Sequence, residues 1–371
     1  MRILFLDAFH GGSHAAVARG YARHSRHELV IESLPIDGGW RWRMRGAAVT
    51  LARRLRLRAD ARTFDQIIAT DMLDLATFLG LTRDLTAHVP VALYFHENQL
   101  TYPLPAGRTR DLAFPWINYT AALAADAVIF NSAFHRRALL DALPGLVGRF
   151  HDYQERDLVA AIAAKSHVLH PGIDLERLQI PDSAAQPARN LQPPVILWNS
   201  RWEYDKNPAA FFAALEALEA RGLDFRLIVA GEHIDPNQAD FLAARGRFAQ
   251  RTLAWGYAPD TASYTRLLHQ ADLVVSTAVQ EFFGVALVEA MACGCVPIAP
   301  NRLAYPEVIP PALHATSLYD TDAHLVEQLA TALNGLPAQA STVAQQAAAR
   351  YGWPLMATRY DALFEQIQRD R

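Results

Sequence analysis

The sequence predicts an α/β protein built from two doubly wound domains in tandem. Short, nearly continuous apolar runs alternate with helical stretches twice along the chain, a pattern typical of parallel strands covered on both faces. A polar, Pro-rich segment, Pro181 to Pro194, separates the two series and is typical of a linker. With 371 residues, 51% hydrophobic and 20% charged, the chain is long enough for two complete cores.

The elements follow in a regular order. The first series predicts strands at Ile3 to Leu6, Leu29 to Leu34, Gln66 to Thr70, Val89 to Phe95, Ala127 to Phe130 and Ser166 to Leu169, with helices such as Ala15 to His24 and Trp116 to Ala125 between them. The second predicts strands at Val195 to Asn199, Phe225 to Ala230, Leu253 to Trp255, Leu273 to Thr277 and Val296 to Ala299, and helices at Ala209 to Arg221, Ala239 to Ala249, Thr261 to Gln270 and Val285 to Ala292. We expect an N-terminal domain over 1–180, a linker over 181–194, a C-terminal domain over 195–345, and a helix over 346–371 that could cross back to the first domain.

Composition narrows the class of protein. The net charge of −3 means that the chain as a whole has no positive field to attract nucleic acid. Eight arginines are nevertheless concentrated between Arg41 and Arg62. Cys293 and Cys295 are too close together for an ordinary disulfide or a zinc site. No apolar run reaches membrane-spanning length, and the N-terminus enters a strand without a signal-peptide pattern. We therefore expect a cytoplasmic protein without stable membrane insertion. The sequence does not specify its oligomeric state.

Two carboxylates in the second series, Glu281 and Glu289, are eight positions apart around a strand–loop–helix turn. A helix beginning near Gly284 would point free N–H groups and its positive dipole end at the loop, which favours a phosphate. Glu281 would stand beside that anion. Glu289, on the helix, could accept hydrogen bonds from a sugar diol.

A cationic loop follows the first strand of the second domain. Arg201 and Lys206 flank it, and Pro208 opens the next helix. A guanidinium and an ammonium at this strand end would stabilise the charge that grows on a diphosphate leaving group. None of the strands predicted above leads into an Asp-x-Asp motif, so we expect the cationic loop to replace a metal ion.

The first domain offers a glycine turn and a histidine at strand ends, where ligands of such sheets bind. Gly11 and Gly12 would let the backbone approach a ligand. His96 could donate to a sugar hydroxyl or position an acceptor. His170-Pro171-Gly172 predicts a structural crossover. In the second domain, Gly231 and the run Trp255-Gly256-Tyr257 end strands where a nucleoside base could lie.

Together these motifs resemble family-four retaining glycosyltransferases of the GT-B fold, with two Rossmann-like domains facing a cleft. A closer resemblance is to the tRNA-queuosine mannosyltransferases. It is carried by Ala8 to His14, Trp40-Arg41-Trp42-Arg43, Tyr94 to Leu100, Arg201 to Lys206 and Glu281 to Val285. That family uses GDP-mannose and, in animals, mannosylates queuosine in the anticodon of tRNA for aspartate.

The resemblance implies roles for residues. On the donor side, Arg201 and Lys206 would hold the diphosphate, Glu281 the mannose hydroxyls and Glu289 the ribose diol, with His96 beside the reacting face of the sugar. The other donor-binding residues would be Gly11, Gly12, Gly231, Phe283, Gly284 and Val285. The acceptor tRNA would meet His10, His14, Trp40, Arg41, Trp42, Arg43, Arg45, Glu97 and Asn98. The implied catalytic set is His96, Arg201, Lys206 and Glu281, with no metal and no cofactor apart from the GDP-mannose substrate.

The basic segment keeps alternatives open. Trp40 and Trp42 interleaved with arginines suit stacking on unpaired bases plus contact with phosphates. The same segment could be a membrane-surface helix for a lipid or polysaccharide acceptor, or merely an exposed helix face. A third hypothesis is a catalytically inactive tRNA-binding protein on this scaffold, against which the intact carboxylate pair and cationic loop argue.

Overall fold

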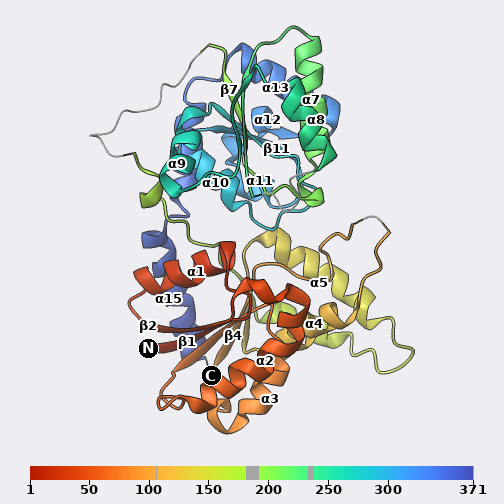
Figure 1. Cartoon of the computed structure of the whole chain (residues 1–371). Helices are drawn as coiled ribbons and strands as arrows, with labels where there is room; N and C mark the ends of the chain where they lie inside the picture. Colours follow the sequence, from red (N-terminus) through yellow and green to blue (C-terminus); the bar gives the residue numbers. More distant parts are fainter. Residues whose placement is uncertain (106, 181–191, 233–237, 371) are drawn as a thin grey trace. The chain divides into compact units, whose positions relative to one another are not determined.

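The computed structural model describes residues 1–105, 107–180, 192–232 and 238–370 (Figure 1). The chain forms two compact units, one from Met1–Ile173 with Trp353–Arg371 and the other from Asp174–Gly352. Each unit contains one six-stranded sheet whose strands all pair in parallel. The predicted α/β class with two doubly wound sheets is confirmed. The predicted linker over 181–194 falls largely outside the described residues.

The sheet of the first unit has the strand order β2-β1-β3-β4-β5-β6. Its strands are β1 (Arg2–Asp7), β2 (Glu28–Ser33), β3 (Gln66–Thr70), β4 (Val91–Phe95), β5 (Ala127–Phe130) and β6 (Ser166–Val168). The chain winds one way from β1 to β2 and the other way from β1 through β3 to β6. The direction therefore reverses between β1 and β3, and in such sheets ligands bind outside the carboxyl ends of the strands at this switch point.

Alternate residues of β1 enter two different cores because side chains of a strand point to opposite faces. Ile3 and Phe5 pack with α1 (Gly12–His24) and α15 (Trp353–Arg369). Leu4 and Leu6 pack on the other face, which is covered by α2 (Trp40–Leu57), α3 (Leu75–Thr86), α4 (Ala113–Ala124), α5 (Ala133–Val147) and α6 (Asp157–Ala164). Figure 1 shows this three-layer arrangement, with α1 and α15 on one side of the sheet and α2 to α4 on the other.

The C-terminal helix α15 is an integral part of the first unit. Trp353 lies over the turn and helix backbone so closely that a Cβ added at Gly172 would be 2.3 Å from its ring, and one at Gly20 would be 2.0 Å from it. The buried Tyr21 hydroxyl donates to Asp361 Oδ1 at 2.9 Å. A helix from the far end of the sequence thus completes one face of the N-terminal sheet.

The second unit has the strand order β12-β11-β10-β7-β8-β9. Its strands are β7 (Val195–Trp198), β8 (Arg226–Ala230), β9 (Thr252–Gly256), β10 (Leu273–Val275), β11 (Val296–Pro300) and β12 (Leu318–Tyr319). Its helices are α7 (Pro208–Ala220), α8 (Ala239–Arg247), α9 (Thr261–Gln270), α10 (Val285–Ala292), α11 (Tyr305–Val308), α12 (His314–Ser317), α13 (Asp322–Asn334) and α14 (Ala340–Ala349). The winding direction reverses between β7 and β10, which places the switch point there.

The observed unit boundaries differ from the expected ones at both ends of the second domain. The segment after Ile173 joins the second unit because its backbone is tied to α9: Thr265 Oγ1 donates to the Arg177 carbonyl at 3.2 Å, and the His269 ring lies 2.8 Å from the Leu178 carbonyl. At the other end, α14 packs against α10. The second unit therefore extends to Gly352 rather than ending at residue 345.

Candidate functional site

The cationic loop and the glutamate loop meet at the switch point of the second unit. Lys206 ends a short 3-10 helix, Tyr204–Lys206, after β7, and Glu281 lies in the loop between β10 and α10. Lys206 Nζ is 3.2 Å from Glu281 Oε2 and 3.2 Å from Asp205 Oδ2, and it donates to the Gln280 carbonyl at 3.0 Å. Two motifs that are 75 residues apart in sequence are thus joined through one ammonium group.

Neighbouring carboxylates keep the Lys206 ammonium protonated. Burial lowers the pKa of the Lys206 ammonium, but the adjacent Glu281 and Asp205 carboxylates raise it by more, so the pKa lies above its ordinary value. Arg201 is different because about half of its side chain, 52%, is exposed, and it pairs with Glu203 at 3.1 Å. The loop therefore presents one fixed, buried cation and one exposed cation that can turn toward a ligand.

The loop into α10 is shaped by Gly284, whose φ of 101° is one that other residues adopt only with strain. It leads directly into the first turn of α10, where Val285 is half-buried and the backbone N–H groups are free to meet an anion. Phe283 is buried, and its ring stands edge-on to Tyr351 at 5.1 Å. The Phe283 side chain therefore packs in the core, and what this residue offers a donor is its backbone.

Glu289 is buried on α10 and already has two partners. Arg177 Nη2 pairs with Glu289 Oε1, and the Tyr264 hydroxyl donates to Oε2 at 3.0 Å. Burial raises the pKa of the Glu289 carboxyl, and Arg177 and Tyr264 offset only part of that rise. Asn199 Nδ2, after β7, donates to the Tyr264 hydroxyl at 3.2 Å. Neither Arg177 nor Tyr264 was found from the sequence, since no motif marks them.

Gly231 and Trp255 have structural roles in the second unit. A Cβ at Gly231 would be 1.9 Å from the Ser200 carbonyl oxygen, so only glycine fits this approach of two backbones. The indole of Trp255 stands 5.8 Å from that of Trp202, and Trp202 stacks on Phe241 at 4.0 Å. The half-buried Trp255 therefore packs against a buried aromatic cluster.

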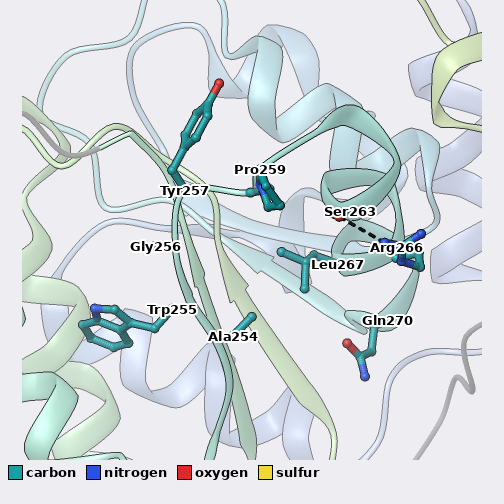
Figure 2. Close-up of a pocket in the computed structure, with 10 residues that line it drawn as sticks. Ala254, Trp255, Gly256, Tyr257, Pro259, Ser263, Arg266, Leu267 and Gln270 are labelled. Carbon is teal, nitrogen blue, oxygen red and sulfur yellow. Dashed lines mark hydrogen bonds between the residues drawn. The ribbon is translucent and has the colours of Figure 1, made fainter.

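A pocket of about 570 Å³ lies between the end of β9 and α9. It is lined by Ala254, Trp255, Gly256, Tyr257, Ala258, Pro259, Ser263, Arg266, Leu267 and Gln270. Figure 2 shows Leu267 pointing into the middle of this group, while the Trp255 indole turns away from it. Tyr257, with 68% of its surface exposed, and Arg266 give the pocket an aromatic ring and a cation at its rim.

In the first unit, three histidines gather around Asp7 at the end of β1. His10 Nδ1 is 2.7 Å from Asp7 Oδ2, and His14 Nδ1 is 3.7 Å from Oδ1. His14 stacks on His96, at the end of β4, with ring centroids 3.9 Å apart. Burial raises the pKa of Asp7, but His14, His96 and His10 outweigh it, so the pKa is lowered well below its usual range.

Asp71, after β3, completes this cluster and was not found from the sequence. Its Oδ1 accepts the His96 backbone N–H at 2.8 Å. Burial raises the pKa of Asp71 to about 7 and lowers that of His96 well below its ordinary value. Among the described residues, His14 Nδ1, His96 Nε2 and Asp71 Oδ2 are buried without a hydrogen-bond partner. Such groups carry a desolvation cost, so a ligand that satisfied them would be favoured.

The other predicted site residues of the first unit are two glycines, which matter for their backbone, and two polar residues, which act through their side chains. A Cβ at Gly11 would be 2.5 Å from Ile36, and Gly12 has a φ of +51°. Asn98 is buried, and its Oδ1 accepts the backbone N–H of Thr101 at 2.8 Å, so it holds the turn. Glu97 accepts from Gln99 Nε2 at 2.8 Å. The structure therefore brings His10, His14 and His96 together, with Glu97 adjacent, while Asn98 supports the loop.

The basic segment forms the start of α2 and is only partly available to a partner. Trp40 packs against Phe114 with ring centroids 4.9 Å apart, and Arg41 lies over the Trp40 ring. Trp42 is 64% exposed. Arg43 donates to the Pro35 carbonyl at 2.9 Å, whereas Arg45 pairs with Asp111 at 2.7 Å. Arg41, Trp42 and Arg45 thus face solvent, and Trp40 and Arg43 serve the fold.

Two properties of the described residues concern membranes and metal ions. None of the helices in these residues combines the length and apolar character needed to cross a bilayer. Within the same residues, no group of three or more His, Cys, Asp or Glu side chains is arranged to hold a metal ion.

Comparison with known proteins places the chain in one family. Residues 2–173 match the family model described as tRNA-queuosine alpha-mannosyltransferase N-terminal, and residues 179–348 match glycosyl transferases group 1. A tRNA-queuosine alpha-mannosyltransferase of Drosophila melanogaster is 34% identical over 332 residues, which span 88% of this chain and 85% of the relative. The chain belongs to the tRNA-queuosine alpha-mannosyltransferase family.

Two further matches are to glycosyltransferases whose names do not mention tRNA. A GDP-mannose:cellobiosyl-diphosphopolyprenol alpha-mannosyltransferase of Xanthomonas campestris is 27% identical over 295 residues, covering 76% of this chain and 69% of the relative. The solved structure of sucrose-phosphate synthase from Thermosynechococcus elongatus matches all of both chains with a TM-score of 0.72 at 16% identity. The tRNA-queuosine alpha-mannosyltransferase family member described here is thus a glycosyltransferase with the GT-B fold.

Proposed function

We propose that this protein transfers mannose from GDP-mannose to queuosine in the anticodon of tRNA for aspartate, with retention of the anomeric configuration. The observation that carries the proposal is the 34% identity to a tRNA-queuosine alpha-mannosyltransferase over 88% of the chain. The Lys206–Glu281 pair at the switch point of the second unit supports it, because a cation beside a carboxylate could bind a diphosphate and a sugar hydroxyl side by side.

The donor would bind to the second unit. The diphosphate would lie at the first turn of α10, with Lys206 and Arg201 as its cations. Glu281, beside Lys206, would accept from mannose hydroxyls. Glu289 would accept from the ribose diol with the lone pairs that Arg177 and Tyr264 leave open, since an ionised carboxylate has about four acceptor sites. The guanine would occupy the pocket next to Tyr257.

Chemistry at the sugar needs charge stabilisation and one proton transfer. The bond between the mannose C1 and the diphosphate oxygen breaks, a bond from C1 to an acceptor hydroxyl oxygen forms, and the hydroxyl proton passes to the departing phosphate. Attack on the face that the phosphate leaves gives retention. Lys206 and Arg201 would stabilise the charge on the leaving GDP, so we propose that the reaction needs no metal ion.

The first unit would receive the acceptor. His10, His14 and His96 surround Asp7 at the carboxyl ends of β1 and β4, where hydroxyl groups of an acceptor could be bound. The exposed residues Arg41, Trp42 and Arg45 would contact the RNA backbone and unpaired bases.

The test is mass spectrometry of nucleosides. The protein is incubated with GDP-mannose and tRNA from cells that make queuosine, and the tRNA is then digested to nucleosides. We expect a queuosine nucleoside heavier by one hexose. tRNA from cells unable to make queuosine is the control, and equal labelling of both tRNAs would reject the acceptor. Labelling of lipid extracts in place of tRNA would favour a lipid acceptor instead.

A further inference from the structure

We propose that a small aromatic pocket on the first unit captures an unpaired base of the tRNA acceptor. The pocket has a volume of about 290 Å³ and lies where the start of α4 meets the end of α5. It is lined by Leu112, Ala113, Trp116, Leu146, Arg149 and Phe150. The choice of RNA as partner rests on the proposed function, but the pocket was not among the motifs found in the sequence.

Its walls are two aromatic rings that the fold leaves exposed. Trp116 is 38% exposed and Phe150 is 48% exposed. Their ring centroids are 5.2 Å apart and the planes are inclined by 62°, so the rings form an open corner rather than a closed stack. Leu146, which is 4% exposed, forms part of the floor. Exposed rings around a hollow mark a binding surface more often than scattered apolar residues do.

The pocket lies next to the start of α2, which carries Arg41 and Arg45. Leu112, a lining residue, follows Asp111, which pairs with Arg45 at 2.7 Å. The Arg45 guanidinium also lies 4.7 Å from the centre of the Phe114 ring, two residues before Trp116. Arg45 at the start of α2 therefore contacts the segment that leads into the pocket. Together the arginines and the pocket supply the two things that unpaired RNA requires, cations for phosphates and flat apolar faces for bases.

The charges around the pocket favour a nucleobase over a lipid surface. Arg149 lines the pocket, and Arg41 and Arg45 lie on the α2 side. Acidic groups are present as well, since Glu155 and Asp157 act electrostatically on Tyr119, whose ring is 5.2 Å from that of Trp116. Carboxylates near the pocket can accept hydrogen bonds from the amino groups of a nucleobase, whereas an acyl chain offers them no donor.

The first experiment measures tRNA binding without catalysis. Trp116→Ala and Phe150→Ala are each expected to weaken tRNA binding by on the order of 10-fold, the usual effect of removing one stacking ring. Trp116→Phe keeps a ring and should retain most of the affinity. Leu242→Ala, at a 52% exposed apolar position on α8 of the second unit, is the matched control and should bind tRNA normally. Thermal unfolding of each variant shows whether it is folded.

The second experiment separates stacking from charge. The affinity of the ring variants should keep the salt dependence of the wild type, while Arg149→Ala should make the slope of log K against log salt shallower by about one unit. If Trp116→Ala and Phe150→Ala are folded and bind tRNA as tightly as the wild type, the proposal is wrong. It is equally wrong if they lose binding to phosphatidylglycerol vesicles and not to tRNA.

A third measurement keeps this proposal distinct from the proposed function. With GDP-mannose as donor, Trp116→Ala should raise the KM for tRNA about 10-fold and leave transfer to free queuosine nucleoside unchanged. A wild-type protein that binds tRNA through Trp116 but transfers no mannose would overturn the proposed function and leave the pocket assigned. Equal loss of transfer to the nucleoside and to tRNA would instead contradict a role in tRNA capture.

Discussion

Arg177 and Glu289 form an ion pair across 112 residues of sequence. The carboxylate is buried, and its second oxygen accepts from the Tyr264 hydroxyl at 3.0 Å. A buried carboxylate that is held on both sides keeps a fixed direction for its remaining lone pairs. The pair therefore connects a segment just after Ile173 to the helix that is proposed to bind the donor ribose.

Removing Arg177 should weaken nucleotide binding through Glu289. We expect Arg177→Ala to lower the affinity for GDP, because a Glu289 carboxylate without its cation is no longer held toward the ribose diol. The expected loss of binding free energy is about 1.5–3 kcal/mol, the value of a hydrogen bond to a charged group. Glu289→Ala should lose a similar amount. Isothermal titration calorimetry with GDP measures both.

The nucleotide analogue 2′,3′-dideoxy-GDP provides the control for that experiment because it lacks the ribose diol. Wild type, Arg177→Ala and Glu289→Ala should bind it with nearly equal affinity. If Arg177→Ala weakens the analogue as much as GDP, Arg177 acts on the fold of the unit and not through the diol.

The two cations of the cationic loop should differ in what they do for stability. Arg201→Ala and Lys206→Ala should each reduce turnover by on the order of 10² to 10³, as loss of a preorganised charge donor does. Lys206→Ala should also destabilise the protein by about 3–5 kcal/mol, because it leaves the buried Asp205 and the half-buried Glu281 without their cation. Arg201→Ala, at a half-exposed side chain, should unfold at the wild-type temperature. Equal melting temperatures for both variants would contradict the buried pairing.

Glu281→Ala should distinguish the sugar from the nucleotide. Because Glu281 is proposed to bind mannose hydroxyls, the variant should lose turnover and affinity for GDP-mannose more than affinity for GDP, which has no sugar. Calorimetry with both ligands tests this. A larger loss for GDP would assign Glu281 to the diphosphate through Lys206.

Metal removal should leave activity intact. Lys206 and Arg201 are proposed to neutralise the leaving group, so mannosyl transfer should proceed at the same rate in excess EDTA. Restoration of a chelator-inhibited enzyme by magnesium or manganese would show that a metal ion takes part.

Asp71 should make the stability of the protein depend on pH. Burial raises its pKa from 3.8 to about 7, and it is influenced by His14 from α1 and Glu97 after β4. Between about pH 4 and pH 7 the folded state holds a proton that the unfolded chain releases, so the free energy of unfolding should fall as pH rises, by at most about 1.4 kcal/mol per unit. Asp71→Asn has no carboxyl to titrate at this position. Its free energy of unfolding, measured by urea denaturation, should therefore rise relative to that of the wild type as the pH increases over the same range. A constant difference would show that Asp71 is ionised throughout.

Local sequence patterns predicted the fold and the loops at the candidate site, but not the contacts between side chains that are distant in sequence. Continuous apolar runs predicted eleven of the strands, and β12 escaped because it has only two residues. Lys206 and Glu281 were found because both follow strands in loops with distinctive residues. Arg177, Tyr264 and Asp71 were missed, since their importance comes from burial beside a partner far along the chain. Trp40 was assigned to RNA on composition, but helical spacing turns it toward Phe114 and leaves Trp42 outside.

The position of α15 sets the order in which this protein can mature during synthesis. One face of the N-terminal sheet is covered by α1 together with Trp353, Tyr360 and Phe364 of α15, so that face stays only partly covered while the whole second unit is being translated. The first unit leaves the ribosome first and finishes folding last. A ribosome that stalls within the second unit would release a chain with a partly exposed apolar sheet, a natural target for chaperones and proteases.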